Sequence, residues 1–136
     1  MTKKDKIFIR QRASACCEYC LSQDQYSPSS FSIEHLIPLI KAGTSNLDNL
    51  AYSCQGCNSF KGVATDAKDP STGLIAPLYN PRIDSWGAHF QWTEDFSSIA
   101  GVSPTGRATV QRLRLNRASV VRLRQILVVL ALHPPF

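Results

Sequence analysis

The sequence predicts an α+β protein, in which a β-hairpin and a short helix form the core and further helices follow. Three patterns support this class. Residues 31–36 alternate apolar and polar side chains, as a strand does, and residues 49–53 can form the returning strand. Residues 54–62 suit a short helix that is ended by Gly62. Near the C-terminus, apolar residues recur at helical spacing from Val120 to Leu130.

The remaining elements are helices and polar loops. Residues 4–15 predict a short basic helix, and residues 22–30 predict a loop. A helix is expected from 103 to 115, with Pro104 tolerated in its first turn. Asn116 is a plausible N-cap for a last helix that reaches Leu132. We expect Arg122 and Arg124 to lie off the apolar face of that helix, which comprises Val120, Leu123, Ile126, Leu127 and Leu130.

A change in composition divides the chain. Residues 64–81 contain three prolines and a glycine, Pro70, Gly73, Pro77 and Pro81. We therefore expect a core of residues 1–65 and an extension of residues 66–136. In the extension, an aromatic segment (82–96) and arginine-rich helices would pack on the core.

Length and composition favour a folded protein. The chain has 136 residues, of which 43% are hydrophobic and 18% are charged, so disorder throughout is not expected. The start of the chain has no secretory signal pattern. The longest apolar run, residues 126–132, is too short to span a membrane. A cytoplasmic protein is the expectation.

Basic residues gather at both ends of the chain. The net charge is +5, and the middle of the chain is close to neutral. Such a distribution is expected for a protein with a polyanionic partner, although solvated helix faces explain the charges equally well. The basic residues of the two ends are Lys3, Lys4, Lys6, Arg10, Arg12, Arg107, Arg112, Arg114, Arg117, Arg122 and Arg124.

Four of the five cysteines form two Cys-x-x-Cys pairs, Cys17/Cys20 and Cys54/Cys57. Two such pairs supply four thiolates, which is a complete ligand set for a structural Zn²⁺. Redox-active dithiols and buried thiols are the alternatives, but neither explains why both pairs flank one polar cluster. Cys16 is left over, and we expect it to be buried or to flank the metal site without binding.

That polar cluster consists of Glu34, His35, Asn49 and Asn58. A carboxylate, an imidazole and an amide suit a hydrolytic metal site. Residues 13–62 resemble the HNH endonucleases of the ββα-metal (His-Me finger) nucleases, in a subtype with zinc knuckles. The resemblance rests on Glu34-His35-Leu36-Ile37-Pro38, Gly43, Asn49-Leu50 and Cys54-x-x-Cys57-Asn58-x-x-Lys61-Gly62.

The resemblance implies a role for each residue of the motif. His35 would be the general base that takes a proton from the attacking water. Asn49 would hold the imidazole in its orientation and tautomer, through either its side chain or its backbone. Glu34 and Asn58 would bind one catalytic Mg²⁺ or Mn²⁺, and Lys61 would contact phosphate. Position 34 is Glu where Asp is frequent, and position 58 is Asn where many members carry His.

The implied substrate is DNA, whose backbone Arg10, Arg12, Arg112 and Arg114 could contact without reading sequence. A monomer would nick one strand, whereas a homodimer could break both, and the sequence does not choose between them. One alternative is a non-catalytic, zinc-stabilised module that binds nucleic acid, and another is a zinc-stabilised protein-interaction domain.

Overall fold

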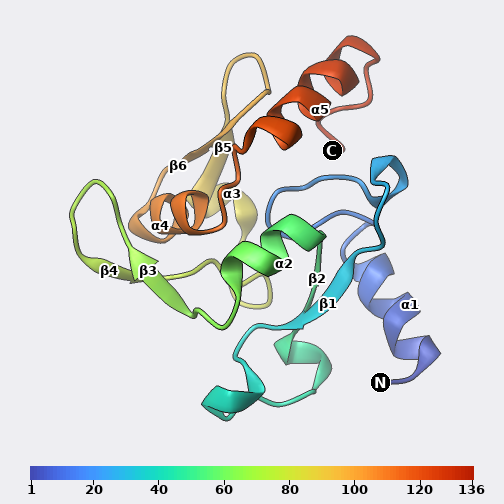
Figure 1. Cartoon of the computed structure of the whole chain (residues 1–136), viewed down its shortest axis with the longest axis vertical. Helices are drawn as coiled ribbons and strands as arrows, with labels where there is room; N and C mark the ends of the chain where they lie inside the picture. The colour runs from blue at the N-terminus through green and yellow to red at the C-terminus, as the bar shows by residue number, and fades with distance from the viewer.

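A computed structural model describes all residues from 1 to 136 and confirms the α+β class (Figure 1). The chain forms five α-helices, three two-stranded antiparallel sheets and three short 3₁₀ helices. The elements of the N-terminal half are α1 (Lys3–Arg12), η1 (Asp24–Tyr26), β1 (Ser32–His35), η2 (Leu39–Lys41), η3 (Leu47–Asn49), β2 (Leu50–Ser53) and α2 (Gln55–Lys61).

The predicted hairpin is the β1–β2 pair, in which Glu34 lies opposite Ala51 and His35 opposite Leu50. Successive side chains of a strand point to opposite faces of its sheet. Leu50 and Tyr52 pack with Ile9 and Ala13 of the α1 region, so one face of the hairpin is covered by α1. Ala51 belongs to the larger core on the other face.

The second predicted helix is α2, which follows β2 directly. Cys54 is its N-cap, and the Cys54 sulfur accepts a hydrogen bond from the Cys57 amide. Gly62 ends the helix with a φ of +55°, a conformation that glycine adopts without a steric penalty. Arg112 donates hydrogen bonds to the carbonyl groups of Phe60 and Lys61 at this end of the helix.

The extension contains strands that the sequence analysis did not predict. Besides three helices, it forms two further hairpins, β3–β4 and β5–β6, each made of three-residue strands. The elements are β3 (Asp66–Lys68), β4 (Ile75–Pro77), α3 (Trp86–His89), β5 (Phe90–Trp92), β6 (Ile99–Gly101), α4 (Pro104–Arg112) and α5 (Ala118–Val129).

One hydrophobic core joins the two parts of the chain. The core residues come from the cysteine motifs, from the β1–β2 hairpin and from the extension, so the extension packs on the N-terminal half. The boundary at residue 65 stays a prediction, because no break in the core marks it. The core comprises Cys17, Tyr19, Cys20, Leu36, Ala51, Cys54, Cys57, Leu78, Tyr79, Phe90, Ile99, Leu113 and Leu115.

Two predictions about the last helix were wrong. Arg117, not Asn116, is the N-cap residue of α5, and the Asn116 side chain instead bonds the backbone N–H and C=O of Ile99. Arg124 is only 3% exposed, where a position away from the core was expected. Its two terminal nitrogens donate to the carbonyls of Ser97 and Leu115 and to the Asn116 side chain, which partly compensates a buried cation whose Nε has no partner.

None of the helices combines the length and the apolar character that a membrane span requires.

Candidate functional site

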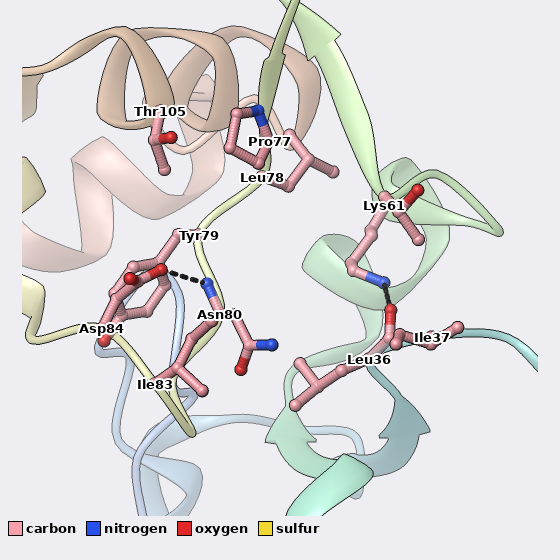
Figure 2. A pocket seen from close by; sticks show the side chains of 11 residues that line it. Leu36, Ile37, Lys61, Pro77, Leu78, Tyr79, Asn80, Ile83, Asp84 and Thr105 are labelled. Atoms are coloured by element: carbon pink, nitrogen blue, oxygen red, sulfur yellow. Dashed lines mark hydrogen bonds between the residues drawn. The ribbon is translucent and has the colours of Figure 1, made fainter. Parts of the chain in front are cut away.

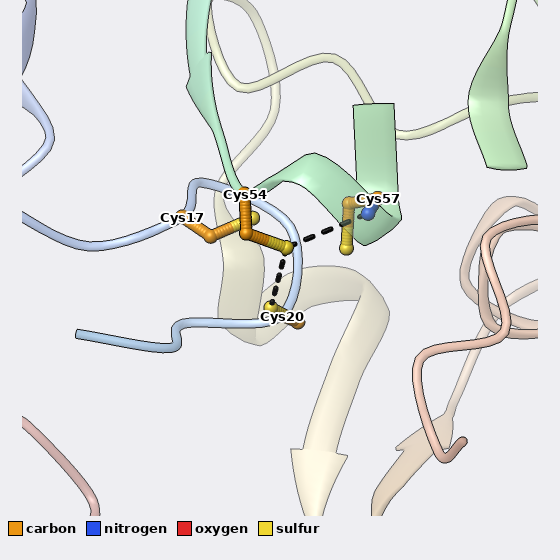
Figure 3. Close-up of side chains that lie close together, drawn as sticks. All are labelled: Cys17, Cys20, Cys54 and Cys57. Atoms are coloured by element: carbon orange, nitrogen blue, oxygen red, sulfur yellow. Dashed lines mark hydrogen bonds between the residues drawn. The ribbon is translucent and has the colours of Figure 1, made fainter. Parts of the chain in front are cut away.

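The four paired cysteines meet in the core, as the sequence predicted. Cys17 and Cys20 lie in the loop after α1, Cys54 follows β2, and Cys57 is in the first turn of α2 (Figure 3). Their sulfur atoms all lie within 4.8 Å of one another, and the Cys20 and Cys54 sulfurs are 3.7 Å apart. Ligand sulfurs about 2.3 Å from a tetrahedral Zn²⁺ would be ~3.8 Å apart, so the cluster fits zinc.

The surroundings of the cluster also suit a metal. All four cysteines are buried, and burial raises the pKa of the Cys17 thiol well above its ordinary value. A bound cation favours the thiolate, so zinc binding would release protons. Cys16 is buried as expected, and it stands outside the cluster with its sulfur donating to the Ser14 carbonyl. Burial raises the pKa of Cys16 to about 11, so this thiol stays protonated.

A solvent-open hollow of about 340 Å³ lies between the β1–β2 hairpin and the end of α2. Glu34, His35 and Asn58 all line it, although they come from two different elements. The spacing of the motif therefore brings these three predicted residues to one place. The other lining residues are Ile33, Pro38, Leu39, Ile40, Gly62 and Val63.

His35 lies at the end of β1 and is half-buried. Its Nε2 is 3.0 Å from the Ser45 hydroxyl oxygen, within hydrogen-bond distance. A second hollow, which is lined by Met1, Asp5 and Ser45, also reaches His35 from the α1 side. The imidazole can thus be reached by solvent and is held through one ring nitrogen. Ser45 had no place in the sequence motif, because it lies in a loop with no distinctive spacing.

The Asn49 side chain bonds backbone groups of the loop after His35 rather than the imidazole. It accepts from the Ile37 amide and donates to the carbonyls of Ile37 and Thr44, at 2.9, 3.0 and 2.7 Å. The Asn49 backbone carbonyl accepts from the Leu36 amide. Asn49 therefore fixes the loop that follows His35 and acts on the ring only through the backbone.

Glu34 points into the core rather than into open solvent. Its carboxylate accepts a hydrogen bond from the Tyr19 hydroxyl and pairs with the Lys61 ammonium at 3.4 Å. Only 6% of Glu34 is exposed, and this burial raises the pKa of its carboxyl group, while Lys61 and Tyr19 lower it. Because Tyr19 lies between Cys17 and Cys20, the first Cys-x-x-Cys turn directly contacts the carboxylate.

Oxygen donors for a divalent cation are present at the hollow. Asn58 is half-buried, and its side chain makes no hydrogen bond within the protein, so its amide oxygen can take a ligand. A carboxylate has about four lone-pair sites, of which Tyr19 and Lys61 use two on Glu34. Oxygen donors of this kind are the ligands that hard divalent cations prefer.

Lys61 is not placed for the phosphate contact that the sequence predicted. It is 2% exposed, and its ammonium group donates to the Leu36 carbonyl at 3.3 Å in addition to pairing with Glu34. Figure 2 shows this side chain at the edge of another cavity, which has a volume of about 240 Å³ and lies between the N-terminal half of the chain and the extension. Tyr79, Asn80 and Asp84 line the opposite wall, and His35 is absent from it.

Most of the arginines that were predicted to contact the DNA backbone instead bond groups of the protein itself. Arg10 pairs with Asp24 at 2.6 Å, and Arg12 donates to the carbonyls of Leu47 and Leu50. Arg112 binds the end of α2, as described above. Arg114 alone among the four makes no hydrogen bond with its side chain, and it is exposed above the Phe60 ring.

Residues 17–63 match the family model described as HNH endonuclease, which confirms that this segment is an HNH endonuclease domain. At the family level, the domain implies nuclease-type activity on a nucleic acid. The chain is also 27% identical over 116 residues to the Septu protein PtuB of Bacillus thuringiensis. That alignment covers 82% of this chain and 41% of PtuB, so the chain spans about two fifths of this relative's length. No solved structure matches the chain.

Proposed function

We propose that this protein is a metal-dependent endonuclease that hydrolyses DNA phosphodiester bonds with His35 as general base. The observation that carries the proposal is the solvent-open hollow shared by His35, Glu34 and Asn58. It unites a proton acceptor with two oxygen donors beside a zinc-type cysteine cluster. This combination is what hydrolysis of a phosphate ester requires.

His35 would accept a proton from the water that attacks phosphorus. One ring nitrogen faces Ser45, so the other is available to the water in the neutral imidazole. Ser45 then holds the ring orientation, while Asn49 fixes the loop that follows it. In this scheme, Ser45 bonds the ring directly and Asn49 positions it through the backbone.

Asn58 and Glu34 would hold Mg²⁺ or Mn²⁺. When bound, such an ion stabilises negative charge on the phosphate and on the leaving oxygen. Asn58 offers its amide oxygen from α2, and Tyr19 and Lys61 orient the Glu34 carboxylate from inside the core. The cysteine cluster would carry a structural Zn²⁺ that fixes Asn58 through its neighbour Cys57.

We propose exposed lysines rather than Lys61 for backbone contacts with DNA. Lys41 lies on η2 beside two residues that line the hollow, and Lys3, Lys4 and Lys6 are exposed on α1. None of these four makes an ion pair within the chain. Their contacts would be independent of sequence and sensitive to salt.

A supercoiled plasmid tests the activity. We expect the zinc-loaded protein to convert it to nicked or linear DNA with Mg²⁺ or Mn²⁺. His35→Ala should lower the rate by about 10²–10⁴-fold, the usual contribution of a general base. His133→Ala is the matched control and should cut as the wild type does, because His133 bonds only the Phe96 carbonyl and packs on Trp92.

The buried position of Glu34 favours one other function, a non-catalytic module that binds nucleic acid. If Glu34 serves only to pair with Lys61 and Tyr19, the hollow would hold no catalytic ion. The same assay distinguishes the nuclease from the binding module. A binding module would slow the migration of the plasmid in a gel but would not cleave it when the metal ion is added. Cleavage that persists unchanged in His35→Ala would refute the proposed role of His35.

A further inference from the structure

Arg117 extends from the start of α5 to the cysteine cluster. Its Nη2 lies 3.4 Å from the Cys54 sulfur, and its Nη1 lies 3.7 Å from the Cys57 sulfur. The two terminal nitrogen atoms of one guanidinium therefore donate hydrogen bonds to two different sulfur atoms. A third contact, from Nη1 to the Arg114 carbonyl, keeps the side chain extended over the knuckle.

Gly56, which lies between these two cysteines, makes this approach possible. A Cβ atom at Gly56 would lie 2.5 Å from the Arg117 Nη2 and 2.7 Å from its Cζ. The guanidinium occupies the space that any other residue at position 56 would fill. The long side chain of Arg117, at the start of α5, thus fits the space left by the absent side chain of Gly56 in α2.

The positive charge of Arg117 would compensate negative charge at the cysteine cluster. Four thiolates around one divalent cation leave two formal negative charges in a buried place, and burying charge without compensation is costly. A guanidinium cancels one of these charges and donates to the sulfur atoms in a fixed planar geometry. Groups that bond metal ligands in this way hold them in position for the metal.

We propose that Arg117 stabilises the zinc-bound thiolates of Cys54 and Cys57, and that it thereby couples the docking of α5 to zinc occupancy. Arg117 is the N-cap residue of α5, so the contact ties the first turn of that helix to the metal centre. Coupling between two sites is reciprocal. Loss of zinc weakens the attachment of α5, and detachment of α5 weakens zinc binding by the same factor. Removal of the Arg117 guanidinium removes this coupling.

A packing role is the competing explanation, and Arg114 provides its control. Both arginines lie over the Phe60 ring, with Cζ to ring-centroid distances of 4.8 Å for Arg114 and 5.8 Å for Arg117. Only Arg117 also reaches the sulfur atoms. A variant of Arg114 therefore reports what the stacking alone contributes.

Transfer of zinc from the loaded protein to a chromogenic chelator measures the effect. Arg117→Met should raise the zinc dissociation constant by about tenfold or more, the range found for groups that bond metal ligands. Arg117→Lys should restore part of the loss, since it keeps the charge and loses the planar pair of donors. Arg114→Met should hold zinc as the wild type does.

Gly56→Ala disrupts the contact without changing Arg117. Alanine suits a helix, so the fold should persist, while its Cβ displaces the end of the flexible arginine. We expect Gly56→Ala to lose zinc as Arg117→Met does, and to add nothing in the Arg117→Met background. In zinc-loaded Arg117→Met, amide hydrogens of residues 118–129 should exchange faster than in the wild type.

Three results would overturn the proposal. One is an unchanged zinc affinity in Arg117→Met, and another is an equal loss in Arg114→Met. The third is a normal affinity in Gly56→Ala together with a loss in Arg117→Met, which would mean that Arg117 acts on folding rather than on the sulfur atoms. The readout is zinc itself, so the result is independent of whether the protein cleaves DNA.

Discussion

At the scale of single residues, Glu34 has the most constrained environment in the candidate site. It is buried, and Tyr19 and Lys61 each contact one of its two carboxylate oxygens. An ion pair in such a place contributes little net stability, but removal of one partner leaves a buried charge unpaired. The pair therefore favours one position of the carboxylate, which is the property that a metal ligand needs.

The Lys61→Met substitution tests this view of Glu34. It should lower the free energy of unfolding by about 3–5 kcal/mol at neutral pH, because ionised Glu34 loses its buried partner. Burial already raises the pKa of Glu34, and the loss of Lys61 removes an effect that lowers it. A carboxyl whose pKa is raised by folding stabilises the protein below its unfolded pKa, about 4.3, and loses this contribution as pH rises through the folded pKa.

The deficit of Lys61→Met relative to the wild type should therefore shrink as the pH falls towards about 4. Urea titrations of both proteins at several pH values measure it. Comparison at each pH removes the effect of acid on the cysteine cluster, which both proteins share. The double variant Lys61→Met/Glu34→Gln should regain most of the stability. A deficit that stays constant with pH would show that Lys61 acts by packing alone.

The sequence predicted which residues gather at the site, but not all of the contacts that these residues make. The motif spacing was sufficient to place Glu34, His35 and Asn58 at one hollow and to bring four sulfurs together. It could not show that Ser45 would bond His35, since that contact depends on the path of the loop between the strands. Nor could it show that Lys61 is buried, because a lysine at the end of a helix is usually solvated.

At the scale of elements, short hydrogen-bonded segments escaped prediction while longer ones did not. The sequence predicted α1, α2, α4, α5 and the first hairpin, but not the four-residue α3. The apolar spacing located α5, although Ile126 and Leu130 of its predicted apolar face are exposed. The β3–β4 hairpin has three-residue strands whose position depends on Asp69, a distant partner of Arg107. The Arg107 guanidinium holds the pKa of this buried carboxyl well below its usual range. No local pattern in residues 66–77 reveals such a pair.

Helix α4 packs closely against the end of α3 and against β6, and this closeness depends on Gly106. A Cβ atom there would lie 1.9 Å from the His89 carbonyl oxygen and 3.3 Å from the Gly101 Cα. Both neighbours are backbone atoms, so α4 would have to move away. Gly106→Ala should lower the free energy of unfolding by about 1–3 kcal/mol, the usual cost of overpacking, and lower Tm accordingly.

Gly87→Ala is the matched control for that measurement by thermal unfolding. Gly87 is also helical, but a Cβ atom there would meet nothing within 4 Å. Because alanine favours a helix over glycine, this variant should be as stable as the wild type or more so. Equal melting temperatures for Gly106→Ala and the wild type would mean that α4 does not depend on this approach.

At the scale of the whole molecule, the arginines of the extension hold the structure together more than they form a basic surface. Arg107, Arg112, Arg117 and Arg124 each bind a carboxylate, carbonyl groups or sulfur atoms inside the protein. Charge counts from sequence do not distinguish such residues from solvated ones. The net charge of +5 remains, and its unpaired part includes the lysines of α1 and η2.

In the proposed mechanism, a cysteine-bound zinc holds a second, exchangeable cation site formed by Asn58 and Glu34 beside His35. Binding of Mn²⁺ to the zinc-loaded protein, followed by electron paramagnetic resonance, tests it most directly. We expect a single Mn²⁺ site in the wild type. Asn58→Ala should weaken it by at least about tenfold, while His35→Ala leaves it intact. Mn²⁺ binding of equal strength in wild type and Asn58→Ala, or none in the wild type, would contradict the account.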